Sequence, residues 1–249
     1  MKTIDTHTWA SNFADARTGY HPLRTRAFLK DVVRPSLAAL DADITRWATR
    51  RDGAWMFAKA ESEALLRVTI QAFCLSIQSL WERQLRNWLS ECVGPGPSSG
   101  QQRRTAQHGP MDKLSSLLSE MRGIPLRAFS TWDDLMLLHL VGNACRHGDG
   151  KSANDLFRAN PELWPNWSSA PLTVPAGDPP MGPPPPPSFE QAVLPRELLD
   201  RFAEAIVGFW EDVAYIRLNS IEPSKQDDLL WAEMNRLRGR RQARIARAR

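Results

Sequence analysis

Four residues near the middle of the chain carry side chains suited to proton transfer and phosphate binding. They are His139, Asn143, Arg146 and His147, in the segment HLVGNACRHG. Residues four apart lie on one face of a helix, so the two histidines and the asparagine would form one stripe with Arg146 beside it. An imidazole can accept or donate a proton near neutral pH, and a guanidinium can stabilise a phosphate. The segment therefore predicts a polar site at the end of a buried helix.

The same side chains also suit a purely structural role. An asparagine near a helix C-terminus can satisfy backbone carbonyls, and Arg146 and His147 would interact favourably with the negative end of the helix dipole. A metal site is not predicted, because two histidines without a cysteine or an acidic residue on the same stripe make a poor ligand set. The choice between chemistry and helix capping stays open at this point.

The elements that must position this segment are predicted to be helices. Apolar residues recur at three- and four-residue steps over residues 23–48, 54–92, 111–122, 130–147 and 195–219. Pro35 is expected to kink or split the first of these helices. Since no alternating pattern typical of strands competes, we expect an all-α protein with a bundle of four to five helices.

The composition along the chain suggests how the bundle is bounded. Residues 1–22 are polar and are expected to be flexible, and residues 23–219 are expected to form the helical domain. Within it, the Gly/Pro/Ser-rich residues 94–110 predict a flexible loop, and residues 165–190 predict a long proline-rich loop or spacer. Residues 220–249 are expected to form a basic C-terminal helix or tail.

The net charge of +4 is unevenly distributed along the chain. The last fourteen residues contain seven arginines and no acidic residue, so the rest of the chain is slightly acidic. Such a tail could bind a phosphate backbone, with a solubilising end as the alternative. The residues predicted to contact nucleic acid are His139, Lys151, Arg236, Arg238, Arg240, Arg241, Arg244 and Arg247.

Other features narrow the class of protein. The three cysteines form no metal-binding or disulfide pattern, and the chain shows neither a secretory signal nor an uninterrupted apolar run of about 18 residues. We therefore expect a cytoplasmic protein without a membrane segment, and no cofactor. Ten tryptophans indicate a Trp-rich core, but Trp164 and Trp167 beside the proline-rich loop are predicted to contact a partner.

The Asn143-x-x-x-His147-Gly148 pattern, late in a helical chain, resembles the motif of the HEPN superfamily. The resemblance implies a four- or five-helix bundle, commonly a homodimer. It also implies a metal-independent ribonuclease of the kind found in toxin–antitoxin, abortive-infection and CRISPR-linked defence systems. In that family an arginine usually precedes the polar residue, whereas this chain has Gly142 there.

Two functions are consistent with these residues. The first is an RNA-directed effector that cleaves RNA through attack of the ribose 2′-hydroxyl. In that case His147 would be the acid–base group, Asn143 would orient it or the phosphate, and Arg146 would partly replace the missing arginine. The second is a non-catalytic dimerisation or interaction subunit that binds nucleic acid or a protein partner in a defence system. Gly142 favours the second function, and the stripe containing His147 favours the first.

Overall fold

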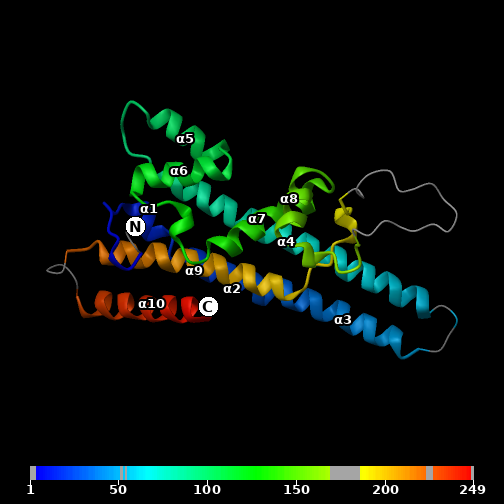
Figure 1. Cartoon of the computed structure of the whole chain (residues 1–249). Coiled ribbons are helices and arrows are strands. Elements are labelled where there is room, and N and C mark those ends of the chain that lie inside the picture. The colour runs from blue at the N-terminus through cyan, green and yellow to red at the C-terminus, as the bar shows by residue number, and fades with distance from the viewer. Residues whose placement is uncertain (1–3, 51–52, 54, 169–185, 223–226, 248–249) are drawn as a thin grey trace. The chain divides into compact units, whose positions relative to one another are not determined.

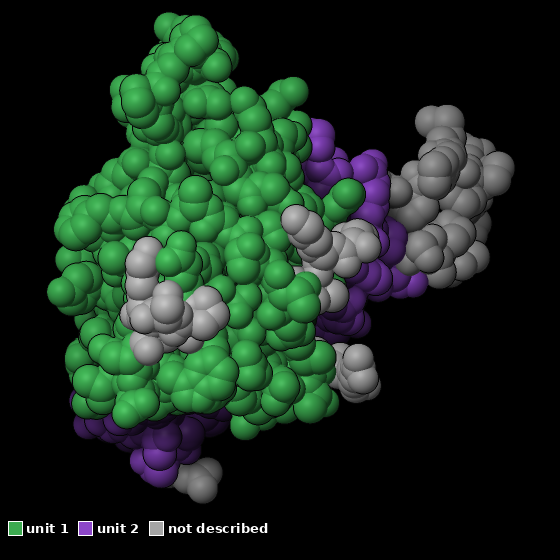
Figure 2. All heavy atoms as spheres, turned by 90° about the vertical axis from the view of Figure 1, so that its left-hand side faces the viewer, with its two compact units in different colours: residues 1–35, 77–136, 200–249 green, residues 36–76, 137–199 purple. Residues whose placement is uncertain are grey.

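The computed structural model describes residues 4–50, 53, 55–168, 186–222 and 227–247, and within them all regular secondary structure is helical (Figure 1). The predicted all-α class is confirmed. The chain divides into two compact units (Figure 2), which are described separately below. Unit 1 comprises residues 1–35, 77–136 and 200–249, and unit 2 comprises residues 36–76 and 137–199.

Ten α-helices are present in the described part of the chain. They are α1 (Phe13–Arg17), α2 (Tyr20–Phe28), α3 (Arg34–Ala48), α4 (Trp55–Cys92), α5 (Ser99–His108), α6 (Met111–Arg122), α7 (Trp132–His147), α8 (Lys151–Ala159), α9 (Glu197–Asn219) and α10 (Asp228–Arg247). The periodic segments predicted to be helical correspond to α2–α3, α4, α6, α7 and α9. Their apolar stripes were long enough to define them from sequence alone.

The expected irregularity near Pro35 takes the form of a π-helical turn. Residues Leu29–Val33 are π-helical, and the Arg34 N–H donates to the Leu29 carbonyl five residues earlier. A proline has no N–H and its ring crowds the carbonyl of the preceding turn, so the wider π turn accommodates it without ending the helix.

Aromatic side chains fill the core of unit 1. Trp81, Trp210 and Phe209 are fully buried, and the Phe209 ring meets those of Trp81 and Trp210 edge to face. Trp88 packs in the same manner on Trp210, with 5.6 Å between the ring centroids. The predicted Trp-rich core is confirmed here, and these rings position α4 against α9.

The predicted flexible segment 1–22 differs most from what the structure shows. Ile4 and Trp9 are buried, and Asn12 begins α1 with a capping box that Asp15 completes. The Asp15 carboxylate is itself buried and accepts hydrogen bonds from Trp88 Nε1 at 3.0 Å and Arg122 Nη2 at 2.9 Å. The polar residues of this segment are thus held by buried partners and not by water, so the prediction of flexibility was wrong for residues 4–22.

The predicted flexible loop at residues 94–110 contains helix α5. Its last carbonyls are capped from α4, because Arg86 Nη1 donates to Ala106 O at 3.2 Å and to Gly109 O at 2.9 Å. Arg86 is fixed in turn by Glu82 at 2.6 Å. A cation at a helix C-terminus satisfies otherwise unpaired carbonyls, which explains how so polar a sequence stays helical.

Unit 2 contains residues 36–48 of α3, residues 55–76 of α4, residues 137–147 of α7, α8 and the segments on both sides of residues 169–185. Those two segments are joined: Trp164 Nε1 donates to Ser188 O at 2.9 Å, and the Val193 N–H donates to Leu163 O at 2.7 Å. Most of the predicted proline-rich loop lies outside the described residues. Trp164 itself is buried against Phe157, so the predicted partner contact was wrong for this tryptophan.

Helix α4 is the longest element in the described part of the chain and contains a strongly apolar stretch. It holds an 18-residue window with a mean hydropathy of 1.3, of which 28% is buried. By length and composition α4 could cross a membrane, although core helices of proteins that never enter one have the same properties. The expectation that no segment spans a membrane therefore stays a prediction.

Candidate functional site at the end of helix α7

Helix α7 ends where the polar motif begins to face solvent. Gly148 adopts a left-handed conformation with φ of 65°, and its N–H donates to Ala144 O at 2.8 Å. A residue with a Cβ would be strained there, so Gly148 is the predicted C-terminal cap. On the other face Val141 and Ala144 are buried, which leaves Arg146 and His147 exposed on the last turn.

The predicted stripe of polar residues is present on one face of the helix. Asn143 Nδ2 lies 3.1 Å from His139 Nε2, and both side chains are half-buried. An amide nitrogen is only a donor, so Asn143 donates this hydrogen bond and the His139 ring accepts it. His139 therefore orients Asn143, and His147 is the exposed histidine of the stripe.

An arginine side chain would not fit at residue 142, the position that the HEPN resemblance assigns to arginine. Gly142 is buried in unit 2, and a long charged side chain at this position would have to enter the core. Arg146 is exposed one turn later, directly before His147, so its guanidinium can act only at the helix end. A cation and an imidazole thus share the last turn of α7.

A surface hollow of about 310 Å³ lies beside this helix end. Its lining residues are Gln71, Ala144, Cys145, Gly148, Asp149, Ser188, Phe189 and Glu190. The Asp149 carboxylate is fixed by the Phe189 N–H at 2.6 Å and by the Ser188 hydroxyl. Two acidic residues, Asp149 and Glu190, would repel a phosphate in this hollow. A nucleic-acid ligand would therefore have to approach His147 from the solvent side of the helix.

The other cation predicted near this site has an acidic partner. Lys151 Nζ lies 2.5 Å from Asp155 Oδ2 on α8, and a hydrogen bond from Lys151 lowers the pKa of that carboxyl. Lys151 is almost fully exposed, so the pair contributes little and the lysine can exchange partners. Both residues, like His139 and His147, belong to unit 2.

The arginines predicted to contact nucleic acid lie on α10 in unit 1, and most of them have partners within that unit. Arg240 and Arg244 each reach Glu211 at 2.7 Å, and Arg244 Nη2 also reaches Asp212 Oδ1 at 2.5 Å. Arg241 is buried between Asp5 and Asp212. The basic C-terminal segment is thus a docked helix, not a free tail, and these three cations are largely neutralised.

The remaining predicted contacts on α10 differ among themselves. Arg236 pairs with Glu233 on the same helix, and Arg238 lies over the Tyr215 ring at 5.8 Å. Arg247 is exposed. Hence Arg247 and the half-exposed Arg236 are the arginines of this set best placed to meet a ligand.

The two acidic partners of α10 titrate differently. Burial alone would raise the pKa of Glu211, but hydrogen bonds from Arg26 and Arg240 and the charge of Arg244 lower it below its ordinary value. Burial raises the pKa of Asp212 to about 6 against the opposing charges of Arg244 and Arg241. Both carboxyls are therefore ionised at neutral pH, when they hold α10.

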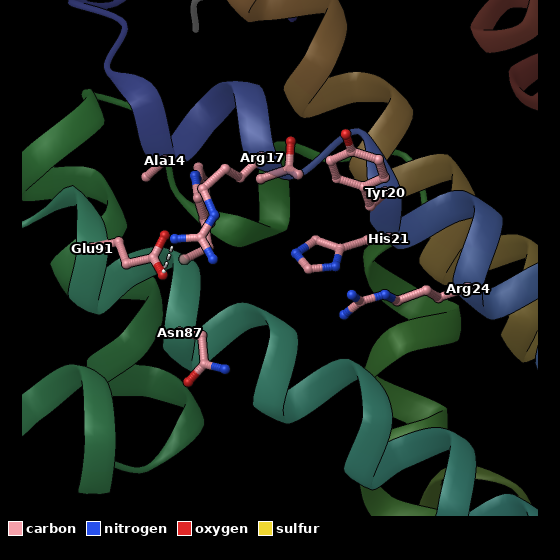
Figure 3. Close-up of a pocket in the computed structure, with 9 residues that line it drawn as sticks. Ala14, Arg17, Tyr20, His21, Arg24, Asn87 and Glu91 are labelled. Atoms are coloured by element: carbon pink, nitrogen blue, oxygen red, sulfur yellow. Dashed lines mark hydrogen bonds and ion pairs between the residues drawn. The ribbon is translucent and has the colours of Figure 1, made fainter.

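A second polar hollow, in unit 1, was missed by the sequence analysis. It measures about 150 Å³ and is lined by Ala14, Arg17, Thr18, Tyr20, His21, Arg24, Asn87, Trp88 and Glu91. Figure 3 shows His21 and Arg24 reaching from α2 towards α4, and Arg17 beside Glu91. Arg17, His21 and Arg24 are spaced at four- and three-residue steps, a pattern typical of side chains on one face of a helix. This pattern was not recognised because residues 1–22 were expected to be flexible.

The pH dependence of stability should report on His21. Burial, then the charges of Arg24 and Arg17, lower its pKa from 6.5 to about 4. In the unfolded chain His21 is protonated below about pH 6.5, whereas in the folded protein it is protonated only below about pH 4. The folded protein therefore loses stability as the pH falls from 6.5 to 4. We expect a loss of about 2–3 kcal/mol for this partly exposed group.

The measurement is urea denaturation at pH 7 and pH 4.5, for the wild type and for His21→Gln. The glutamine variant should lose less stability on acidification, and the difference isolates His21 from the other titrating groups. Equal losses in the two proteins would contradict the assignment.

Comparison of the chain with known proteins assigns it to no family. No family model matches the chain, and neither the curated proteins nor the solved structures include a significant match. Within the described residues no group of three or more His, Cys, Asp or Glu side chains could hold a metal ion.

Proposed function

We propose that the protein is an RNA-directed effector similar to HEPN domains, acting through the exposed end of α7. The observation that supports this proposal most is that an imidazole, His147, and a guanidinium, Arg146, are both exposed on the last turn of α7. The proposed setting is a cytoplasmic defence or toxin–antitoxin system. Asn143, fixed by His139 at 3.1 Å, adds an oriented amide to the same face.

The proposed reaction needs no metal ion. The ribose 2′-hydroxyl attacks the adjacent phosphorus, the bond to the 5′-oxygen breaks, and a 2′,3′-cyclic phosphate and a 5′-hydroxyl result. His147 accepts the proton of the attacking hydroxyl or donates one to the leaving oxygen, and Arg146 stabilises the charged phosphorane. Since one chain supplies one exposed imidazole at this turn, a symmetric homodimer would supply both proton-transfer groups.

The test is RNA cleavage by the purified full-length chain with His147→Ala. Loss of a general acid or base is expected to slow cleavage by about 10²-fold or more. His108→Ala is the matched control, because His108 is also exposed and also ends a helix before a glycine. Equal cleavage by His147→Ala and the wild type would remove the catalytic proposal.

A second candidate, a non-catalytic interaction subunit, is favoured by a separate observation. Unit 2 exposes large apolar side chains on the first half of α4: Met56, Phe57, Leu65 and Val68. Gly142 and the acidic hollow beside α7 also favour binding without cleavage. In this case Phe57→Glu should weaken self-association in analytical ultracentrifugation, while His147→Ala leaves every measured property unchanged.

A further inference from the structure

The hollow between α2 and α4 in unit 1 combines two arginines with an imidazole that has an unsatisfied nitrogen. Arg24 is exposed, and none of the described carboxylates pairs with it. His21 Nδ1 is buried and lacks a hydrogen-bond partner among the described residues. These groups all favour an anion.

The acidic residue in the hollow does not cancel this preference. Glu91 pairs with Arg17 at 2.9 Å, but the two side chains are 42% and 58% exposed. Exposed pairs of this kind contribute little, so Arg17 can exchange Glu91 for a ligand at small cost. With Arg17 and Arg24 both charged and Glu91 ionised, the hollow keeps one net positive charge.

The size of the hollow and its surroundings limit the ligand further. A volume of about 150 Å³ is that of about five water molecules, which is enough for a phosphate group and too little for a nucleoside. Tyr20 lines the hollow and is 65% exposed. Phe13 and Leu23, the sequence neighbours of the lining residues Ala14 and Arg24, are exposed by 78% and 62%. An exposed aromatic ring is a surface on which a nucleobase can stack.

We propose that this hollow binds the 5′-phosphate of a nucleotide, with Arg17, Arg24 and His21 around the phosphate and the base on the aromatic rim. The nucleotide is either free or the first residue of an RNA strand, since both present the same phosphate monoester. Arg24 supplies the main charge, Arg17 turns from Glu91 to the phosphate, and Asn87 offers an amide donor from α4. The site does not depend on His147 or on RNA cleavage.

The test is calorimetric binding of five probes to the full-length chain: inorganic phosphate, uridine, uridine 5′-monophosphate, and oligouridylate with and without a 5′-phosphate. Uridine 5′-monophosphate should bind more tightly than phosphate, and uridine should not bind. If the 5′-phosphorylated oligonucleotide binds more tightly than its 5′-hydroxyl form, the ligand is the 5′ end of an RNA strand. Binding of the mononucleotide alone identifies a free nucleotide. Binding of uridine as tightly as its monophosphate would overturn the proposal.

Three variants assign the binding to this hollow. Arg24→Gln should raise the Kd about 10-fold, because one charged hydrogen bond to the phosphate is lost. Glu91→Gln should lower the Kd about 3-fold, because it frees Arg17 and removes the one acidic side chain in the lining. Arg104→Gln, an exposed arginine on α5, is the control and should leave the Kd unchanged.

Two results with the variants would also overturn the proposal. Equal effects of Arg24→Gln and Arg104→Gln would show general surface attraction, and weaker binding by Glu91→Gln would show that no phosphate meets Arg17. Cleavage assays on His147→Ala are a separate measurement, so failure of the proposed ribonuclease activity and failure of this binding site can be told apart.

Discussion

Replacing Arg122 with methionine is expected to lower the free energy of unfolding by about 3–5 kcal/mol. The Arg122 and Asp15 side chains are 6% and 0% exposed, and Arg122 Nη2 lies 2.9 Å from both carboxylate oxygens. The guanidinium also stacks over Trp9 and approaches Cys92 Sγ at 3.1 Å. The variant leaves the Asp15 carboxylate buried without its cation, which is far costlier than losing a surface pair.

Urea denaturation measures the effect, and two further variants define its cause. Arg34→Met breaks an ion pair with Asp200 whose side chains are 61% and 53% exposed, and should cost less than about 1 kcal/mol. The double variant Asp15→Asn, Arg122→Met should recover part of the loss, because no buried charge is left unpaired. An Arg122→Met variant as stable as Arg34→Met would show that the pair is not isolated from water.

This buried pair also shows why the N-terminal segment could not be predicted from the sequence. Arg122 and Asp15 are 107 residues apart, and nothing local identifies either as the partner of the other. A polar segment looks flexible when its partners are unknown. The Asn12-x-x-Asp15 pattern was the local signal, because it is typical of a capped helix start.

The helices were predictable for the opposite reason. The apolar periods of α4, α6 and α9 are local, and they continue for enough turns to exclude a strand. The hydrogen bond between His139 and Asn143 follows from the same helical geometry, since residues four apart are neighbours. The acidic hollow beside His147 is different, because Ser188, Phe189 and Glu190 reach it from beyond the proline-rich segment.

The ion pairs of the basic C-terminal segment could not be predicted without knowing its partner helix. The apolar stripe of α9 was identified, but Glu211 and Asp212 within it were not considered as partners for the arginines. Both acidic residues are buried on α9, where they face α10. Gly208 allows the close approach: a Cβ at this position would lie 2.8 Å from Arg244 Nε. A run of arginines therefore indicates nucleic-acid binding only when no internal acidic cluster neutralises it.

Replacing Glu211 with glutamine should remove the negative charge that neutralises the arginines of α10. Glu211 accepts ion pairs from Arg26 at 3.0 Å and from Arg240 and Arg244 at 2.7 Å, and its side chain is 6% exposed. We expect about 2–4 kcal/mol less stability, because three arginines lose their carboxylate at once. The freed cations on α10 should also bind RNA more strongly, with a steeper dependence on salt because more counterions are released.

Limited trypsin digestion and RNA filter binding at two salt concentrations measure these effects. Glu233→Gln is the matched control, since Glu233 pairs with Arg236 on α10 itself through half-exposed side chains and should change stability by less than about 1 kcal/mol. If Glu211→Gln resists trypsin and binds RNA as the wild type does, the buried Met234 and Leu237 side chains hold α10 in place without the ion pairs. If it binds RNA more tightly while Glu233→Gln does not, the acidic pair on α9 is what keeps these arginines from RNA in the native protein.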